Sequence, residues 1–218
     1  GDVAHELRTT LTTIQGSMEG LLDGVLPAQD ETFQQVLHEA TRLQKLVRDL
    51  QELSRVESDS FAMNLRPLDV WALVDTACGR LSQQFIEKQV ALSNKVTGEM
   101  PQVLADEDRI GQVLLNLIGN ALQYTPTDGW VRITAATSSD DVSITIQDSG
   151  IGISAEHIPH VFTRFYRVDK SRARVGGGSG IGLTIAKRIV EASGGTMYAH
   201  SPGEGQGSSF AFTLPRAG

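Results

Sequence analysis

The first eleven residues, GDVAHELRTTL, bring a histidine, a glutamate and a threonine together in a segment with the pattern of a helix. His5 and Thr9 are four residues apart, so both side chains lie on one helix face. A free imidazole has a pKa of about 6.5 and is therefore mostly a neutral nucleophile at pH 7. Glu6 is the direct neighbour of His5, and adjacent helix positions point in different directions, so an ordinary solvated glutamate is the alternative interpretation. Thr9 has the corresponding alternative of a surface residue.

A pair of asparagines indicates a second kind of chemistry. Asn116 and Asn120 are one helical turn apart in the apolar stretch LLNLIGNALQYTP, with Gln112 and Tyr124 on the same face. Asparagine is usually exposed, so two of them on one face of an apolar helix indicate the wall of a pocket. Their amide oxygens suit Mg²⁺ that also holds phosphates. The alternative is that the pair caps or bridges neighbouring backbone groups.

Two glycine clusters, DSGIGIS at 148–154 and GGGSGIGLT at 176–184, match neither the P-loop nor the dinucleotide-binding fingerprint. Either cluster taken alone is more often a turn than a ligand site. The second one leads straight into a helix, whose N-terminal N–H groups favour anions such as phosphates. Gly180 and Gly182 would let a ligand approach the backbone closely.

Asp148 ends a predicted strand at the first glycine cluster. It could simply begin a turn, where aspartate is common. Alternatively, its carboxylate accepts a hydrogen bond from an amine on a flat base, and Gly150 and Gly152 leave room for the ring.

Residues 1–58 contain two helical patterns that would carry the histidine. Gly24 and Pro27 lie between them and indicate a turn, so the two helices form a hairpin. Since two helices alone bury such seams poorly, we expect a dimeric four-helix bundle; packing of the hairpin on the rest of its own chain is the alternative. The apolar seams have heptad spacing and comprise Leu7, Leu11, Ile14, Met18, Leu21 and Val25 in the first helix, and Phe33, Val36, Ala40, Leu43, Val47 and Leu50 in the second.

The remainder of the chain has a different pattern. The seam is lost after residue 58 and Pro67 ends any helix, so we place a linker at 59–67 and a second domain at 68–218. Helices are expected at 70–88, at 109–125 after an N-cap at Asp106 or Asp108, and within 179–195; strands are expected at 130–137, 141–148, 196–201 and 208–215. The order of these elements predicts an α+β sandwich with a largely antiparallel sheet.

The bulk composition restricts the class of protein. The 218 residues carry a net charge of −7, which argues against a nucleic-acid-binding protein. A single cysteine, Cys78, permits no internal disulfide and fits a reducing cytosol. No apolar run reaches the roughly 20 residues of a membrane span. Because the chain starts inside a helical pattern, we expect a cytoplasmic piece of a longer protein.

Five motifs in order, HELRTTL, LLNLIGNALQYTP, DSGIGIS, FTRFYR and GGSGIGL, resemble the H, N, G1, F and G2 boxes of bacterial sensor histidine kinases. The resemblance covers nearly the whole chain. It implies a dimerisation and histidine-phosphotransfer hairpin, followed by an ATP-binding domain of the GHKL (Bergerat) fold. It also implies a parent protein anchored in the inner membrane.

The resemblance further implies roles for individual residues. His5 would be the phosphoacceptor, Glu6 would orient or deprotonate it, and Thr9 would take part in phosphatase activity. Asn116 and Asn120 would hold Mg²⁺ and phosphates, and Asp148 would bind the adenine amino group. Phe162 and Phe165 would anchor a mobile lid. The other residues that would bind ATP are Tyr124, Gly150, Gly152, Ile153, Gly178, Gly180, Gly182, Leu183 and Ser208.

Three positions affect the charge or geometry of the predicted site. Arg167 belongs to the basic run RFYRVDKSRAR, which is either a solvated loop or a lid whose cations meet the γ-phosphate. Gln123 stands where many members of the family have lysine or arginine, so one positive charge near the phosphates is lost. Thr10 stands where proline is usual and keeps its N–H, which predicts a straighter helix.

The sequence therefore predicts a kinase that phosphorylates His5 from ATP and passes the phosphoryl group to an aspartate of a response-regulator receiver domain. Related ATPases carry a glutamate where this chain has Asn116, and an amide cannot act as a general base at neutral pH. Two alternatives stay open, a GHKL-type ATPase and a nucleotide-binding dimer scaffold without kinase activity.

Overall fold

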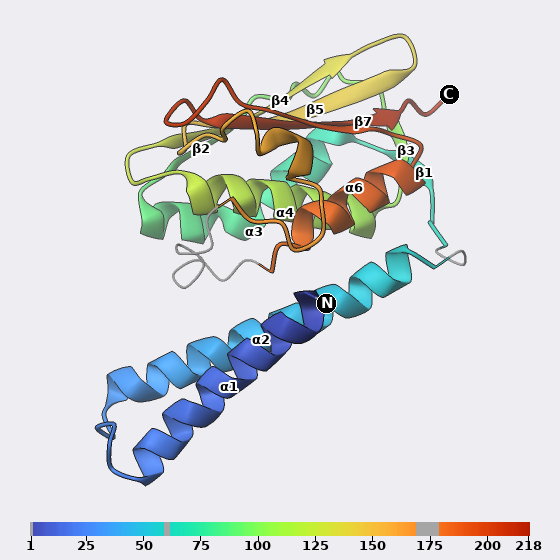
Figure 1. Ribbon diagram of the computed structural model, residues 1–218. Helices are drawn as coiled ribbons and strands as arrows, with labels where there is room; N and C mark the ends of the chain where they lie inside the picture. The colour runs from blue at the N-terminus through green and yellow to red at the C-terminus, as the bar shows by residue number, and fades with distance from the viewer. Residues whose placement is uncertain (1, 59–61, 169–178) are drawn as a thin grey trace.

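The heptad seams of the N-terminal part form the predicted helical hairpin, made of α1 (Asp2–Leu22) and α2 (Asp30–Val56) (Figure 1). The computed structural model describes residues 2–58, 62–168 and 179–218. α1 continues without a break through Thr10, which is buried. In the turn, the Thr32 hydroxyl donates to the carbonyl of Pro27 at 2.9 Å, and Gly24 takes a φ of +70° that an L-residue rarely adopts.

Much of the predicted seam remains in contact with water in the single chain. Leu11, Met18, Phe33 and Val47 are 42–52% exposed. Val25, predicted as the last seam position of the first helix, instead lies in the turn beyond α1. Apolar side chains repeated along one face of a hairpin are typical of helices that pack against further helices. The dimeric bundle stays a prediction that this exposed stripe supports.

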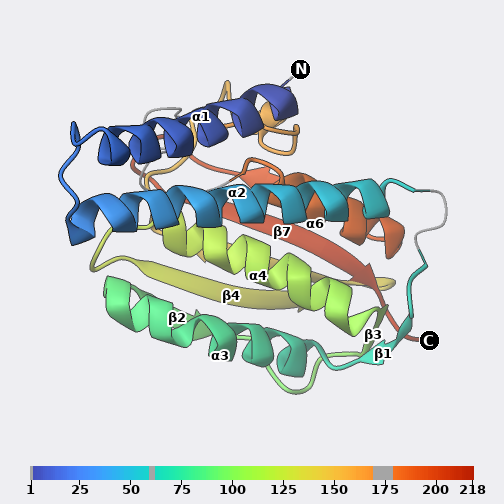
Figure 2. The same cartoon turned by 90° about the horizontal axis from the view of Figure 1, so that it is seen from below.

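A second apolar side of α2 faces the C-terminal domain. Leu46, Leu53 and Val56 lie off the predicted seam, yet all three are buried and join the same cluster as the core of that domain. α2 packs against α6, and Figure 2 shows it crossing this helix. Three of its carboxylates also contact the domain: Asp49 accepts a hydrogen bond from the Ser179 hydroxyl, Glu52 pairs with Arg109, and Glu57 pairs with Arg164.

The C-terminal domain is built on a five-stranded sheet in the order β2-β4-β5-β7-β6. The strands are β2 (Ala91–Asn94), β4 (Trp130–Thr137), β5 (Asp141–Asp148), β6 (Met197–His200) and β7 (Ser208–Pro215). All neighbours are antiparallel except β2 and β4. β1 (Arg66–Leu68) and β3 (Val103–Ala105) form a separate antiparallel pair.

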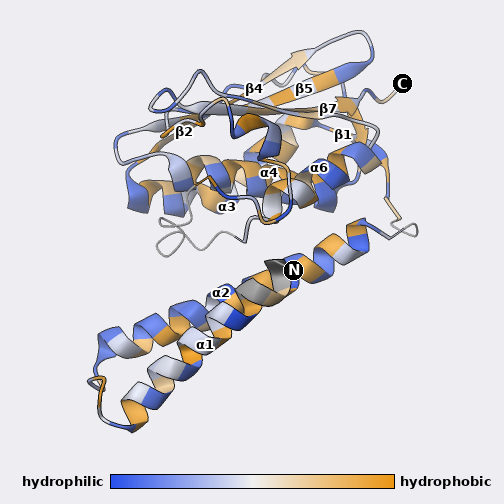
Figure 3. Ribbon diagram, in the orientation of Figure 1, coloured by the Kyte–Doolittle hydropathy of each residue, from blue (hydrophilic) through white to orange (hydrophobic). Residues whose placement is uncertain are grey.

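Three helices cover one face of this sheet, α3 (Val70–Lys88), α4 (Glu107–Tyr124) and α6 (Gly182–Ala192), and the hairpin lies below them (Figure 1). Figure 3 shows these helices as mixtures of hydrophobic and hydrophilic residues, as expected of amphipathic helices between a core and water. The expected α+β sandwich with a largely antiparallel sheet is thereby confirmed. None of the helices in the described ranges combines the length and apolar character needed to cross a bilayer.

Both ends of α4 are closed by side chains. Asp106 is the N-cap and accepts from the backbone N–H of Arg109 at 3.2 Å, so the first of the two predicted caps is the one used. At the other end, the Lys88 ammonium donates to the carbonyls of Leu122 at 2.7 Å and Gln123 at 2.9 Å. Partial burial lowers the pKa of Lys88 from its ordinary value. α4 is therefore fixed at both ends.

Replacing Lys88 with methionine keeps the length of the side chain and removes both contacts. Two carbonyls at the negative end of the α4 dipole lose a cationic donor, so we expect the free energy of unfolding to fall by about 1–2 kcal/mol. Urea unfolding followed by circular dichroism measures this change. Lys95→Met is the matched control, because Lys95 is exposed and its side chain has no hydrogen-bond or ion-pair partner among the described residues. Equal stability of the two variants would contradict the assigned role of Lys88.

Candidate functional site

A buried carboxylate lies at the end of β5. Asp148 is 4% exposed and stands opposite Ser208 in the register of β5 and β7. One carboxylate oxygen accepts from the N–H groups of Gly150 (2.8 Å) and Ser208 (3.2 Å), and the other accepts from the Ser208 hydroxyl (2.6 Å). A carboxylate offers about four acceptor positions, so these three donors leave it able to accept one more from a ligand.

Asp148 opens into a cavity of about 130 Å³, here called the Asp148 cavity. Its lining is mainly apolar, which suits a flat ring, while Asp148 supplies a specific acceptor. Eight of the predicted site residues line it, namely Asn120, Tyr124, Asp148, Gly152, Ile153, Arg167, Leu183 and Ser208. The structure therefore brings together residues from the first glycine cluster, α4, α6 and β7.

A second cavity of about 100 Å³, the Asn116 cavity, adjoins the first. Asn120, Tyr124, Arg167 and Leu183 line both cavities, so the two form one cleft with Asp148 at one end. The predicted residues found only in the second are Asn116, Gly180 and Gly182. Asn116 of α4 and two glycines of the second cluster thus meet in the part of the cleft away from Asp148, whereas Asn120 and Tyr124 line both parts.

Glycine is required at one place around this cleft and leaves space at another. Gly152 has a φ of +68°, and a Cβ there would lie 2.0 Å from the carbonyl oxygen of Gly203. A Cβ on Gly182 would lie 3.1 Å from the amide oxygen of Asn116, whose nitrogen donates to the Gly182 carbonyl at 3.4 Å. The first glycine is needed for the backbone path, and the second leaves space beside Asn116 at the start of α6.

The predicted phosphoacceptor region is described only in part. His5 and Glu6 belong to α1, but their side chains lie outside the described part of the structure, as does Gly178. Thr9 is exposed on α1, and its carbonyl accepts from the Thr13 hydroxyl at 3.0 Å. The roles of these residues therefore stay predictions.

Several residues of the cleft were not predicted from the sequence. Tyr166 lines both cavities, and its hydroxyl is 2.6 Å from Nδ1 of His157. Tyr166 lies inside the FTRFYR motif, and an aromatic residue in that motif could have indicated a cleft residue. Lys45 and Asp49 of α2 line the Asn116 cavity, and their sequence surroundings contain no such signal.

The segment that holds Tyr166 is bound to α6 and to the glycine turn before it by hydrogen bonds at the backbone of two phenylalanines. The N–H of Phe165 donates to the carbonyl of Gly180 at 2.9 Å, and the Thr184 hydroxyl donates to the carbonyl of Phe162 at 2.9 Å. The Phe162 ring also packs edge-on against Phe210 of β7, with ring centroids 6.3 Å apart. Both phenylalanines were predicted as anchors, and these contacts support that role.

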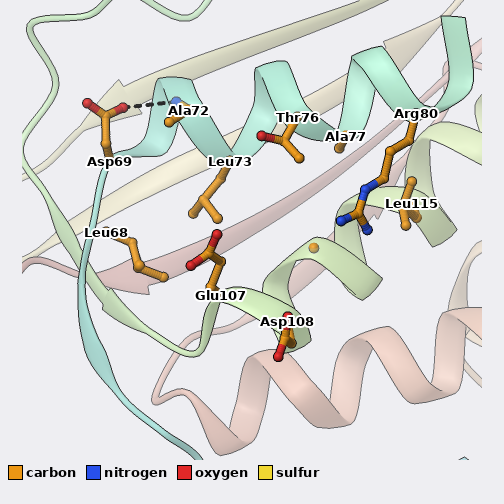
Figure 4. A pocket seen from close by; sticks show the side chains of 11 residues that line it. Leu68, Asp69, Ala72, Leu73, Thr76, Ala77, Arg80, Glu107, Asp108 and Leu115 are labelled. Carbon is orange, nitrogen blue, oxygen red and sulfur yellow. Dashed lines mark hydrogen bonds between the residues drawn. The ribbon is translucent and has the colours of Figure 1, made fainter.

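A cavity of about 170 Å³ lies elsewhere, between α3 and α4 (Figure 4). None of the predicted site residues lines it. Figure 4 shows the carboxylate of Asp69 turned to the backbone N–H of Ala72, at 3.0 Å, where it caps α3. The glycine clusters and paired asparagines needed for a phosphorylated ligand are at the Asp148 and Asn116 cavities instead.

The cleft fits a nucleotide with a bound divalent cation. Within the described ranges, no group of three or more histidine, cysteine, aspartate and glutamate side chains could hold a metal by itself. The half-buried amides of Asn116 and Asn120 are one turn apart on α4, and their oxygens could complete a coordination sphere supplied mainly by phosphates.

Known proteins match both parts of the chain. Residues 105–218 match the family described as Histidine kinase-, DNA gyrase B-, and HSP90-like ATPase, and residues 1–59 match the His Kinase A (phospho-acceptor) domain. The signal transduction histidine-protein kinase BaeS of Escherichia coli (strain K12) is 37% identical over 202 residues, which cover 92% of this chain and 43% of BaeS. The chain spans well under half the length of the curated relatives that it matches.

Solved structures share the whole architecture. The Acinetobacter baumannii histidine kinase AdeS superimposes with a TM-score of 0.81 at 28% identity, over 98% of both chains. Full-length ShkA, solved in complex with AMPPNP, superimposes with a TM-score of 0.73 at 28% identity, over 99% of this chain and 46% of its own.

Replacing Asp148 with asparagine tests the base end of the cleft. An amide has less acceptor strength than a carboxylate and can present an N–H to the incoming amine, so we expect the affinity for ATP to fall at least ~30-fold, or about 2 kcal/mol. Wild-type protein should prefer ATP to GTP, because guanine has a carbonyl in place of the 6-amino donor. Isothermal titration calorimetry measures both affinities.

Asp141→Asn, at the opposite end of β5, is the control for removing one carboxylate from this strand. Thermal unfolding of Asp148→Asn shows whether the variant is folded, since the buried carboxylate also bonds Gly150 and Ser208. A folded Asp148→Asn variant that binds ATP as well as the wild type would show that Asp148 does not bind the base.

Proposed function

The chain belongs to the sensor histidine kinases, and on that premise we propose that it binds ATP in the cleft between α4 and α6, phosphorylates His5, and passes the phosphoryl group to an aspartate of a response-regulator receiver domain. One observation carries the proposal: Asp148 lines one part of the cleft and Asn116 lines the other, and Asn120 lines both. That arrangement suits a ligand with a base at one end and phosphates at the other.

Each end of the cleft has a distinct task in this proposal. Asp148, Gly152 and Ser208 bind the adenine ring and its amino group. Asn116 and Asn120 would hold Mg²⁺, which neutralises phosphate charge when it is bound. Gly180 and Gly182 leave the N-terminus of α6 open to the phosphates.

The transfer needs a nucleophile and the absence of an activated water. A neutral nitrogen of His5 attacks the γ-phosphorus, the bond to the β-phosphate oxygen breaks, and ADP leaves as the N–P bond forms. Glu6 accepts the proton that the imidazole loses. Asn116 is an amide at a position where a carboxylate would activate water, so ATP is retained until the histidine arrives.

The hairpin supplies the other partners. Residues 1–58 form the homodimer and present His5, and residues 68–218, joined by a linker at 59–67, bind the nucleotide. The exposed seam of α1 and α2 supports the dimer. Thr9, exposed on the same helix as His5, positions water in a phosphatase reaction toward the phosphorylated regulator. The parent protein is a longer sensor anchored in the inner membrane, and this chain is its cytoplasmic part.

Incubation with γ-labelled ATP and Mg²⁺ tests the phosphoacceptor. We expect acid-labile, base-stable label on the wild type and at least ~100-fold less on His5→Gln, because glutamine has no nucleophilic nitrogen at neutral pH. His38→Gln is the matched control, since His38 is an exposed histidine of the same hairpin. Label that persists on His5→Gln would exclude His5. ATP hydrolysis without any phosphohistidine would favour the ATPase alternative, and ATP binding with neither reaction would favour the scaffold.

Asn120→Ala tests the phosphate end of the cleft separately. Alanine is a strong helix former, so α4 is retained while the amide oxygen is lost. We expect the ATP affinity of the wild type to rise at least ~10-fold when Mg²⁺ replaces EDTA, and that of the variant to change about threefold or less. Calorimetric titrations in the two buffers give this ratio, and Gln112→Ala, on the same face but outside both cavities, is the control. An unchanged Mg²⁺ effect in Asn120→Ala would remove Asn120 from the metal site.

A further inference from the structure

The wall of the Asn116 cavity is completed by the hairpin. Lys45 and Asp49 of α2 line this cavity together with Asn116 and Gly182 of the C-terminal domain. α2 packs against α6, whose first residue is Gly182, and Figure 2 shows the two helices crossing. The end of the cleft farthest from Asp148 is therefore formed across the contact between the two parts of the chain.

Lys45 is a cation without a protein partner at this place. It is exposed, and among residues 2–58, 62–168 and 179–218 no side chain or carbonyl is within hydrogen-bonding or ion-pairing distance of it. Asp49, one turn further along α2, accepts a hydrogen bond from the Ser179 hydroxyl. An ammonium on a flexible stem with no protein acceptor is suited to meet an anion that enters the cavity.

The order of residues along the cleft decides which part of a nucleotide Lys45 would meet. Asp148 and Ser208 line only the Asp148 cavity, whereas Lys45 lines only the Asn116 cavity. A nucleotide whose base lies at Asp148 extends toward α2, so its last phosphate is the group nearest to Lys45. Gln123 lines both cavities and is neutral, so α4 contributes no cation at this end.

We propose that Lys45 is a phosphate-binding residue of the nucleotide site, which the hairpin supplies to the terminal phosphate of ATP when the C-terminal domain packs against α2. The inference rests on the proposed function, because it takes the cleft to be the ATP site. Lys45 supplies the positive charge that Gln123 does not.

Because Lys45 lies on α2, binding of the terminal phosphate and packing of the domain against α2 favour each other. ATP, which reaches Lys45, should slow amide hydrogen exchange in residues 44–56 of the wild type more than AMP does. In Lys45→Met this difference between ATP and AMP should disappear.

Calorimetric titration of the full chain with ATP and AMP, in buffer with Mg²⁺, tests the assignment. We expect Lys45→Met to weaken ATP binding about five- to tenfold and to leave AMP binding unchanged, because only ATP carries a terminal phosphate near α2. Lys45→Arg should stay within about twofold of the wild type. The double variant Lys45→Met with Gln123→Lys should regain most of the ATP affinity, since it returns one positive charge to the same cavity.

Arg48→Met is the matched control, because it removes one exposed cation from α2 at a position outside both cavities. Equal losses in Lys45→Met and Arg48→Met, or a loss that is the same for AMP and ATP, would overturn the assignment. Unchanged ATP binding by Lys45→Met would overturn it while leaving the proposed function intact. If the wild type binds no ATP, the proposed function fails and this inference fails with it.

Discussion

The buried charge of Asp148 is the constraint on which the rest of the cleft depends. An ionised carboxylate removed from water is costly unless donors surround it. The pairing of β5 with β7 provides them, because it sets Ser208 directly opposite Asp148. Gly207, with a φ of +73°, allows the backbone before β7 to pass close to the backbone of Asp148. A Cβ on Gly207 would lie 2.0 Å from the Asp148 carbonyl oxygen. The register of two strands thus fixes the position of the buried carboxylate in the cleft, which is the position proposed for the base.

α4 connects this point to the other end of the cleft. Its buried residues, such as Leu114 and Leu117, hold the helix against the domain core, and the same helix presents Asn116 and Asn120 to the cavities. Because capping fixes both ends of α4, the two amides keep their positions relative to the sheet. A site that binds a nucleotide by its two ends needs such a rigid connection, since a small displacement at one end would misplace the phosphates at the other.

The long, strongly periodic elements could be predicted from the sequence, as could the short strand β6 within the predicted range 196–201, but the other short strands could not. The predicted bounds 70–88, 130–137, 141–148 and 208–215 agree with α3, β4, β5 and β7. β1, β2 and β3 have only three or four residues each, too few to show a period, and they form through pairing with distant strands. Most of the predicted residues of the cleft lie at or near the end of β5, the start of β7 and the start of α6, or on one face of α4. Lys45 and Asp49 join them through contacts between the two parts of the chain, for which a local pattern contains no signal.

The two sides of α2 make different contacts. The seam side carries large apolar residues that are exposed in the single chain. Covering them with further helices would stabilise the fold by about 25 cal/mol per Å² of apolar surface buried. The other side meets the C-terminal domain through a few apolar residues and ion pairs such as Glu57 with Arg164, whose side chains are 27% and 49% exposed. Ion pairs this exposed contribute roughly 0–1 kcal/mol each. The buried side chains of Leu46, Leu53 and Val56 therefore contribute more to this packing than the exposed ion pairs do.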